Sequence, residues 1–159
     1  MLIGILSDSH DNLTAMKKAL ATFLSYQVNL VVHAGDYVAP FTVALLTAQN
    51  TPWIGVLGNN DGEILGLFQK SGGRITSPYM EWREGPYSIW VSHDYPLAEL
   101  AFASTRFDLC VYGHTHQPDI REEKRKFLIN PGESSGIVNG KPTVAICDLK
   151  IRQTKLVEL

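Results

Sequence analysis

The sequence predicts an α/β (α+β) fold in which two mixed β-sheets pack face to face, with helices on their outer faces. The N-terminal half alternates short apolar runs of strand length with segments of helical spacing. This alternation is typical of parallel strands joined by right-handed crossovers. The C-terminal half contains mainly β-forming runs separated by turn residues, with one further helical segment. These two sequence patterns together indicate two sheets that pack against each other.

The N-terminal half contains three predicted strands and three predicted helices. In order, they are strand 1–7, helix 13–24, strand 29–34, helix 41–48, strand 51–57 and helix 64–69. The first helix begins after Asp11 or Asn12, either of which can cap it. The second begins after Pro40, a favoured residue of the first turn. The apolar face of the first helix is predicted to consist of Leu13, Met16, Leu20, Phe23 and Leu24.

The C-terminal half begins with a predicted hairpin around Gly85-Pro86. Its elements are strands 79–84 and 87–93, helix 97–104, strand 108–112, short strands from 117 onward, and strands 144–149 and 154–159. Residues 121–126 mix basic residues with Glu122 and Glu123, which indicates a solvated hairpin. Asn139-Gly140 predicts a second hairpin turn, and Pro142 delays the strand after it.

Composition narrows the class of protein. A chain of 159 residues suits a single domain, 1–159. The net charge of −2 and the absence of a long basic run argue against long nucleic acid as a partner. No apolar run reaches the length of a membrane span, and no signal peptide is evident. Cys110 and Cys147 lie in apolar runs, which favours buried free thiols. We therefore expect a cytoplasmic protein, and the sequence leaves a homo-oligomer open.

Chemically active side chains follow the predicted strands. They are Asp8 and His10, Asp36, Asn59 to Asp61, His93, and His114 and His116. Each has a local explanation when taken alone, such as Asp8 capping a helix or Asp36 lying in a turn. Taken together they converge, because ligands bind at the carboxyl ends of strands in α/β sheets. Two Asp, one Asn amide and four His suit two cations that share one carboxylate.

Five ordered motifs carry a family resemblance: Asp-x-His, Gly-Asp, Gly-Asn-x-Asp, a lone His after a strand, and Gly-His-x-His. This order resembles the calcineurin-like metallophosphoesterase superfamily. The short chain and Asn130-Pro131-Gly132 resemble its small phosphodiesterase branch. The resemblance extends from Asp8 to Gly132 and implies a four-layer αββα sandwich. It also implies a hydrolase of small phosphodiesters with a dinuclear metal centre.

The resemblance assigns roles to individual residues. One metal would be held by Asp8, His10 and His116, a second by Asn59, His93 and His114, and Asp36 would bridge them. Asp36, Asn59 and His93 are also the expected catalytic residues. Asp61 is expected to support a ligand loop, and His33 is expected to be structural. Mn²⁺ is the expected metal, with Fe, Zn²⁺, Ni²⁺ and Co²⁺ as alternatives.

Two positions depart from the family pattern. Asn60 stands where many members have a histidine, and an amide cannot transfer a proton at neutral pH. Glu133 stands where the small branch often has serine, and it faces either the site or solvent. The main alternative function is a non-catalytic metal-binding scaffold or protein-interaction module of the same fold. A single-metal hydrolase ranks last, because it leaves several of the candidate ligands without a role.

Overall fold

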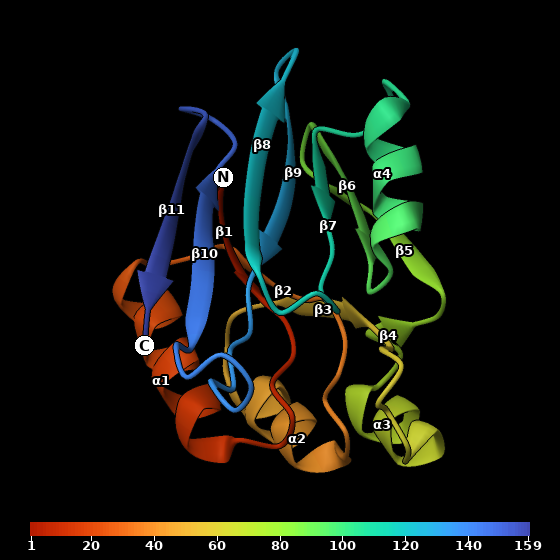
Figure 1. Ribbon diagram of the computed structural model, residues 1–159, viewed down its shortest axis with the longest axis vertical. Coiled ribbons are helices and arrows are strands. Elements are labelled where there is room, and N and C mark those ends of the chain that lie inside the picture. The colour runs from red at the N-terminus through yellow and green to blue at the C-terminus, as the bar shows by residue number, and fades with distance from the viewer.

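The computed structural model describes residues 1–159, which form two β-sheets that face each other (Figure 1). The first sheet has six strands in the order β11-β10-β1-β2-β3-β4. The strands are β1 Leu2–Leu6, β2 Leu30–His33, β3 Trp53–Val56, β4 Ile75–Thr76, β10 Thr143–Asp148 and β11 Gln153–Glu158. β1 to β4 are parallel, whereas β10 and β11 add antiparallel pairs at one edge.

The second sheet has five strands in the order β5-β6-β7-β9-β8. They are β5 Tyr79–Glu84, β6 Tyr87–Ser92, β7 Leu109–Val111, β8 Pro118–Glu123 and β9 Lys126–Pro131. The central strands β6, β7 and β9 are parallel, and the two edge strands pair antiparallel with them. Both sheets are therefore mixed, as predicted.

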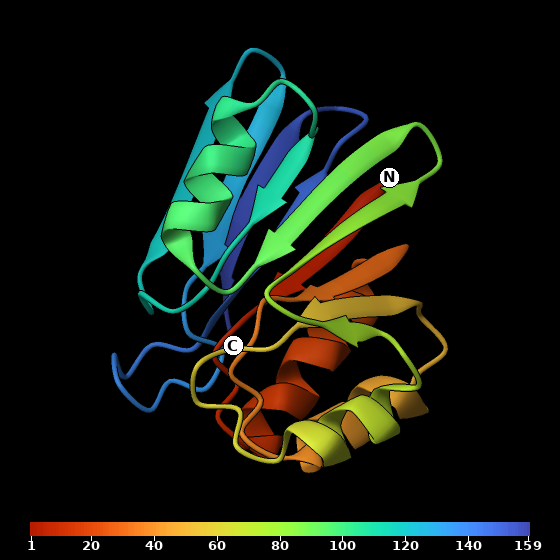
Figure 2. The ribbon, with the colours of Figure 1, turned by 90° about the vertical axis from the view of Figure 1, so that its right-hand side faces the viewer.

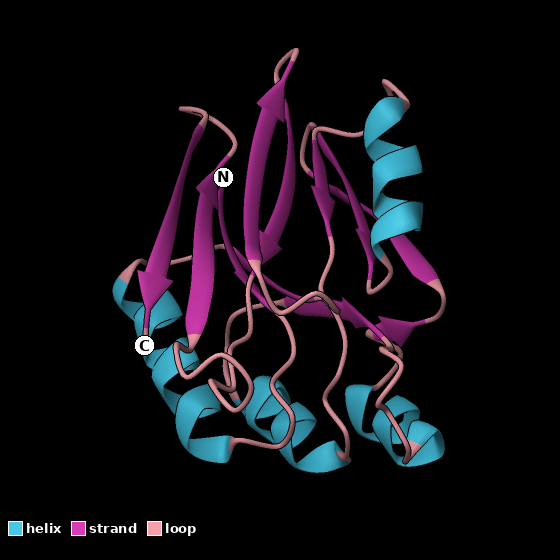
Figure 3. Ribbon diagram, in the orientation of Figure 1, coloured by secondary structure: helices cyan, strands magenta, loops and turns pink.

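Helices cover the outer face of each sheet (Figures 2 and 3). α1 Leu13–Ser25, α2 Pro40–Ala48 and α3 Ile64–Ser71 pack on the first sheet, and α4 Tyr95–Ala103 packs on the second. One apolar cluster fills the space between the sheets, and two others fill the spaces between each sheet and its helices. This arrangement is the four-layer αββα sandwich. None of the four helices is long and apolar enough to cross a bilayer.

Two local predictions were wrong, and one strand was not predicted. Asn139 and Gly140 do not form a hairpin, because the segment that contains them connects β9 of one sheet to β10 of the other. Leu24 is 75% exposed, since the buried face of α1 consists of Ala15, Met16, Ala19 and Phe23. The two-residue strand β4 was missed because it is too short to show a period. Asn12 is the cap of α1, accepting a hydrogen bond from Ala15 N.

The two sheets together position the candidate site. β1, β2 and β3 end toward it from the first sheet, and β6 and β7 end toward it from the second. The loops after β1 and β7 are joined directly, since His114 N donates to Asp8 Oδ2 at 3.2 Å. The strand ends therefore meet where the sequence analysis expected the polar side chains to gather.

Candidate metal centre

The loops that carry the candidate ligands have an unusual backbone. Asp8, His10, Asp36, His114 and His116 all have positive φ values, between 43° and 67°. Asp8 and His10 therefore do not continue the extended strand, because β1 ends at Leu6. Non-glycine residues rarely adopt this left-handed conformation, and such strain concentrates at functional sites. Here it turns the side chains inward.

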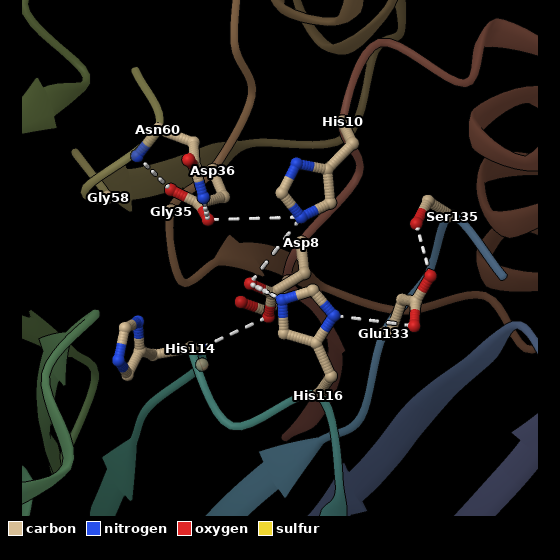
Figure 4. A network of polar contacts seen from close by, with 12 residues as sticks. Asp8, His10, Gly35, Asp36, Gly58, Asn60, His114, His116, Glu133 and Ser135 are labelled. Atoms are coloured by element: carbon tan, nitrogen blue, oxygen red, sulfur yellow. Dashed lines mark hydrogen bonds and ion pairs between the residues drawn. The ribbon is translucent and has the colours of Figure 1, made fainter. Parts of the chain in front are cut away.

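Four of these side chains form a first donor group (Figure 4). Asp8, His10, Asp36 and His116 offer ligand atoms that all lie within 4.8 Å of one another. Asp8 Oδ1 is 3.4 Å from His116 Nε2 and 4.0 Å from His10 Nε2. Asp8 Oδ1 and His10 Nε2 are buried and have no hydrogen-bond partner. Buried polar atoms are normally paired, so these two unpaired atoms fit the ligands of a cation.

Asn59, His93 and His114 form a second donor group beside the first. Asn59 Oδ1 lies 2.9 Å from His93 Nε2 and 2.7 Å from His114 Nδ1. The other ring nitrogen of His93 lies 2.8 Å from the Ala34 carbonyl oxygen, which can only accept, so that nitrogen carries the proton. In the neutral ring, Nε2 then has a free lone pair that faces another acceptor. A cation between such atoms resolves the conflict.

Asp36 lies between the two groups. Its Oδ2 is 3.8 Å from His10 Nε2 on one side and 3.6 Å from His93 Nε2 on the other. Asn60 holds the carboxylate in place, donating from its backbone nitrogen to Oδ1 at 2.8 Å and from its side-chain amide to Oδ2 at 2.7 Å. One buried carboxylate therefore contacts members of both groups.

The charge of the donor set fits divalent cations. Burial raises the pKa of Asp8, because a carboxylate loses its hydration there. A hydrogen bond from Ser7 and the nearby imidazoles of His93 and His116 only partly offset this effect. A bound cation would favour the ionised form, and the mixture of carboxylate, amide and imidazole donors suits first-row divalent metals.

Glu133 contacts the ring nitrogen of His116 that does not face Asp8. It is buried rather than facing solvent, and its Oε2 lies 3.3 Å from His116 Nδ1 (Figure 4). Burial by itself would raise the pKa of Glu133, but hydrogen bonds from Ser135, Val138, Asn139 and His116 lower it, so the group stays ionised. An ionised carboxylate accepts a hydrogen bond from His116 Nδ1–H, which keeps the proton on Nδ1 and leaves Nε2 free to bind a metal.

His33 and Asp61 hold the ligand loops. His33 is fully buried, accepts from Gly35 N at 3.2 Å and contacts Ser9 Oγ at 2.9 Å. Burial lowers its pKa well below the usual value, so His33 is a neutral structural residue. Asp61 accepts from Gly58 N and Val38 N, both at 2.7 Å. These contacts fix the loops that carry Asp36 and Asn59.

Two glycines allow neighbouring segments of the chain to approach each other closely. A Cβ on Gly58 would collide with the Asp36 backbone and carboxylate, and one on Gly113 would collide with Ser7 Oγ. The φ of Gly58 is not positive, so no left-handed backbone requires a glycine there. Its role is to let two ligand loops come close together.

Sequence reasoning missed the walls of the site. A pocket of about 410 Å³ is lined by His10, Asn60 and His116 together with Val38, Ile137 and Val138. Ile137 and Val138 are 63% and 66% exposed, which is unusual for adjacent β-branched residues in a loop. Their only signal in the sequence is an apolar pair between Gly136 and Asn139. The metal-ligand candidates therefore face a pocket with partly apolar walls.

Known proteins share this architecture. Residues 1–152 match the calcineurin-like phosphoesterase superfamily domain. A phosphodiesterase of Methanocaldococcus jannaschii is 32% identical, over 100% of this chain and 99% of that protein. A probable metallophosphoesterase of Methanothermobacter thermautotrophicus is 31% identical, over 83% of this chain and 76% of that protein. The structure of an archaeal phosphodiesterase matches with a TM-score of 0.91 at 31% identity, with full coverage of both chains.

The αββα fold and its cluster of Asp and His side chains define a metallophosphoesterase. The chain belongs to the calcineurin-like phosphoesterase superfamily and is a metal-dependent hydrolase of phosphoester bonds. The structure of Vacuolar Protein Sorting 29 from Cryptosporidium parvum is also similar, with a TM-score of 0.73, 99% of this chain and 96% of that chain covered. At 20% identity, that likeness shows the fold alone.

Proposed function

We propose that this protein hydrolyses small phosphodiesters at a pair of divalent cations. The observation that carries the proposal is the position of Asp36 Oδ2, between His10 Nε2 at 3.8 Å and His93 Nε2 at 3.6 Å. A carboxylate oxygen in contact with two separate donor groups is the arrangement that a shared ligand requires. The full-length likeness to a named phosphodiesterase supports a diester as the substrate.

The proposal assigns seven ligands. Asp8, His10 and His116 hold one cation, Asn59, His93 and His114 hold the other, and Asp36 serves both. Mn²⁺ fits this mixture of hard and borderline donors, with Fe, Zn²⁺, Ni²⁺ and Co²⁺ as alternatives. When bound, such a pair supplies Lewis acidity at phosphorus and a water of lowered pKa.

The residues of the chain set the conditions for the reaction. Asp36, Asn59 and His93 are the proposed catalytic residues. The Ala34 carbonyl oxygen orients the ring of His93, so that its Nε2 faces Asn59. Asn60 keeps Asp36 in place and cannot transfer a proton at neutral pH. The site therefore favours substrates with good leaving groups.

The pocket supports a small substrate. Its volume of about 410 Å³ lies within the range of small-molecule sites. Val38, Ile137 and Val138 would contact an apolar or aromatic part of the diester beside the metal ligands. The net charge of −2 supports exclusion of long nucleic acid. The two free, buried cysteines support a reducing compartment such as the cytoplasm.

The alternative is a metal-binding scaffold or interaction module without catalysis. The two proposals differ in a direct measurement. Metal content per chain is determined by mass spectrometry, and hydrolysis of bis(4-nitrophenyl) phosphate is followed before chelation, after it, and after Mn²⁺, Ni²⁺ or Co²⁺ is added back. We expect two metals per chain, no activity after chelation, and recovery with added metal. Undiminished hydrolysis with verified metal loss would contradict the mechanism.

Variants test the shared carboxylate. Asp36→Asn should lower metal content at both positions and nearly abolish turnover, because the amide lacks the charge and the second anionic oxygen. His10→Ala and His114→Ala should each lower the metal content of one position more than that of the other. The control is Glu158→Gln, a carboxylate-to-amide change at an exposed position of β11. One metal per wild-type chain, with no effect of His114→Ala, would favour a single-metal hydrolase.

A further inference from the structure

A second pocket lies at the far end of the strands from the metal centre. Its volume is about 370 Å³. The turn between β8 and β9, the segment after α4 and the turn between β10 and β11 surround it, all in the upper part of Figure 1. Its cationic lining residues are Arg106, Lys124, Arg125, Lys126, Lys150 and Arg152.

The charge of this pocket differs from that of the whole chain. Six of the chain's 14 Lys and Arg residues line it, but only one of its 16 acidic residues does. That residue, Asp108, accepts from Ser88 N at 2.8 Å and Ser88 Oγ at 2.9 Å, and it forms no ion pair with the cations. The chain as a whole carries −2. The pocket is therefore a local concentration of positive charge on a weakly acidic protein.

Several of the cations lack an acidic partner. Arg106 pairs with Glu81, and Arg152 pairs with Glu122. Lys126 is buried, and its Nζ donates to the backbone carbonyl oxygens of Phe102 and Ser104. Lys124, Arg125 and Lys150 form no ion pair. Crowding of like charges is unfavourable unless something offsets it, and an anionic ligand would do so.

Turns of two hairpins carry three of these cations. Lys124, Arg125 and Arg152 have positive φ values of 47°, 72° and 59°. Lys124 and Arg125 form the two-residue turn of the β8–β9 hairpin, where glycine and asparagine are favoured because they tolerate this conformation. Two separate turns thus place cations around one pocket.

The pocket is separate from the metal centre but structurally connected to it. β6 begins at Tyr87, which lines the pocket, and ends before His93. β7 begins after Asp108, which also lines the pocket, and ends shortly before His114. Six residues of extended chain span about 20 Å. A ligand in this pocket would therefore not touch the metal ligands.

We propose that this pocket binds a small ligand through a chain of two or more phosphate groups, as found in inorganic oligophosphates and nucleoside triphosphates. Arginine offers paired N–H donors to phosphate oxygens, and lysine offers a mobile point charge. The volume suits a small molecule, and the lining has only three hydrophobic residues among its 11. This composition matches a polar anion better than an apolar ligand.

The test uses the full-length, Zn²⁺-loaded protein and two probes, tripolyphosphate and ATP. Lys124→Glu/Arg125→Glu is compared with Lys17→Glu/Lys18→Glu, which makes the same change of charge on the exposed face of α1. Binding is measured by calorimetry, and the binding site is mapped by NMR shifts of backbone amides. Thermal unfolding of each variant confirms that it is folded.

We expect tripolyphosphate to shift amides in 105–108, 124–126 and 149–152. The pocket variant should weaken this binding by about tenfold or more, and the α1 variant by less than twofold. Similar affinities for the two probes would assign the recognition to phosphate alone, whereas tighter binding of ATP would assign it to a nucleotide; both support the pocket. Equal losses in the two variants, shifts confined to the metal-centre loops, or equal binding of adenosine would overturn the proposal.

Discussion

The carboxylate of Glu133 lies 3.3 Å from His116 Nδ1 and joins a candidate metal ligand to the wall of its pocket. The same carboxylate accepts from Ser135 Oγ at 2.7 Å, Val138 N at 2.7 Å and Asn139 N at 3.0 Å. It therefore fixes both the ring of His116 and the loop that carries Val138. A serine at this position would be too short to make all of these contacts.

Glu133→Gln should weaken metal binding and activity together. The amide is nearly the same size but lacks the charge that keeps the His116 proton on Nδ1. Loss of such a supporting carboxylate typically costs about 10–100-fold in metal affinity or activity. Metal affinity is measured by competition with a chromogenic chelator, and Glu158→Gln serves as the control. An unchanged metal affinity would show that the contact supports only the loop.

The two cysteines should be unreactive in the folded protein. Burial raises the pKa of Cys110 to about 12 and that of Cys147 to about 11. The thiolate is the reactive form, so almost none is present at pH 8. A thiol-specific chromogenic disulfide should therefore label neither residue until denaturant is added, and should then label both. Rapid labelling of either thiol without denaturant would contradict this prediction.

Stability should fall in acid partly because of His33. Burial, with the nearby His93 and His10, lowers the pKa of His33 well below its usual value of about 6.5. Below that pH the unfolded chain takes up a proton that the folded chain does not, so unfolding becomes more favourable as pH falls. One such proton contributes a slope of about 1.4 kcal/mol per pH unit.

The slope is measured by urea unfolding at pH 6.5 and 5.5, with metal removed by chelation so that metal binding does not contribute. His33→Gln removes the titrating group while keeping a donor toward Ser9. The variant should lose less stability than the wild type between the two pH values, whatever its stability at pH 6.5. Equal losses would mean that His33 takes up its proton without unfolding.

Much of the fold could be predicted because its signals are local. Short stretches of sequence are enough to predict alternating strands and helices, and a cap such as Asn12. The polar residues after the strands also predicted where the candidate site would lie. β4 could not be predicted, since two residues have no period. The turn at Asn139 and Gly140 was misassigned because turn residues do not reveal which strands they join.

Contacts between distant segments were the part that sequence could not supply. Glu133 is 17 positions from His116, and nothing local distinguishes a buried carboxylate from an exposed one in that loop. The left-handed backbone of Asp8 and His10 likewise depends on bonds to the loop after β2, such as Asp8 N to Gly35 O. The motif order indicated which residues gather, whereas their orientation is set by tertiary contacts.

Asn60 donates hydrogen bonds to Asp36 from both its backbone and its side chain. Because its amide cannot transfer a proton, the departing oxygen receives no help from this position. A positioned general acid typically contributes about 10²–10⁴-fold. The wild-type rate should therefore depend steeply on the pKa of the leaving group, with aryl diesters reacting well and alkyl diesters poorly.

Asn60→His should reduce that dependence, since an imidazole can donate a proton to a poor leaving group. Asn60→Ala is the matched control, because it also removes the side-chain bond to Asp36 but introduces no acid. Both variants are compared with the wild type across diesters graded in leaving-group pKa, after metal content has been measured. The histidine variant should gain most for alkyl diesters, and the alanine variant should slow all substrates alike. A wild-type series already insensitive to the leaving group would show that another donor supplies the proton, and would remove this role from position 60.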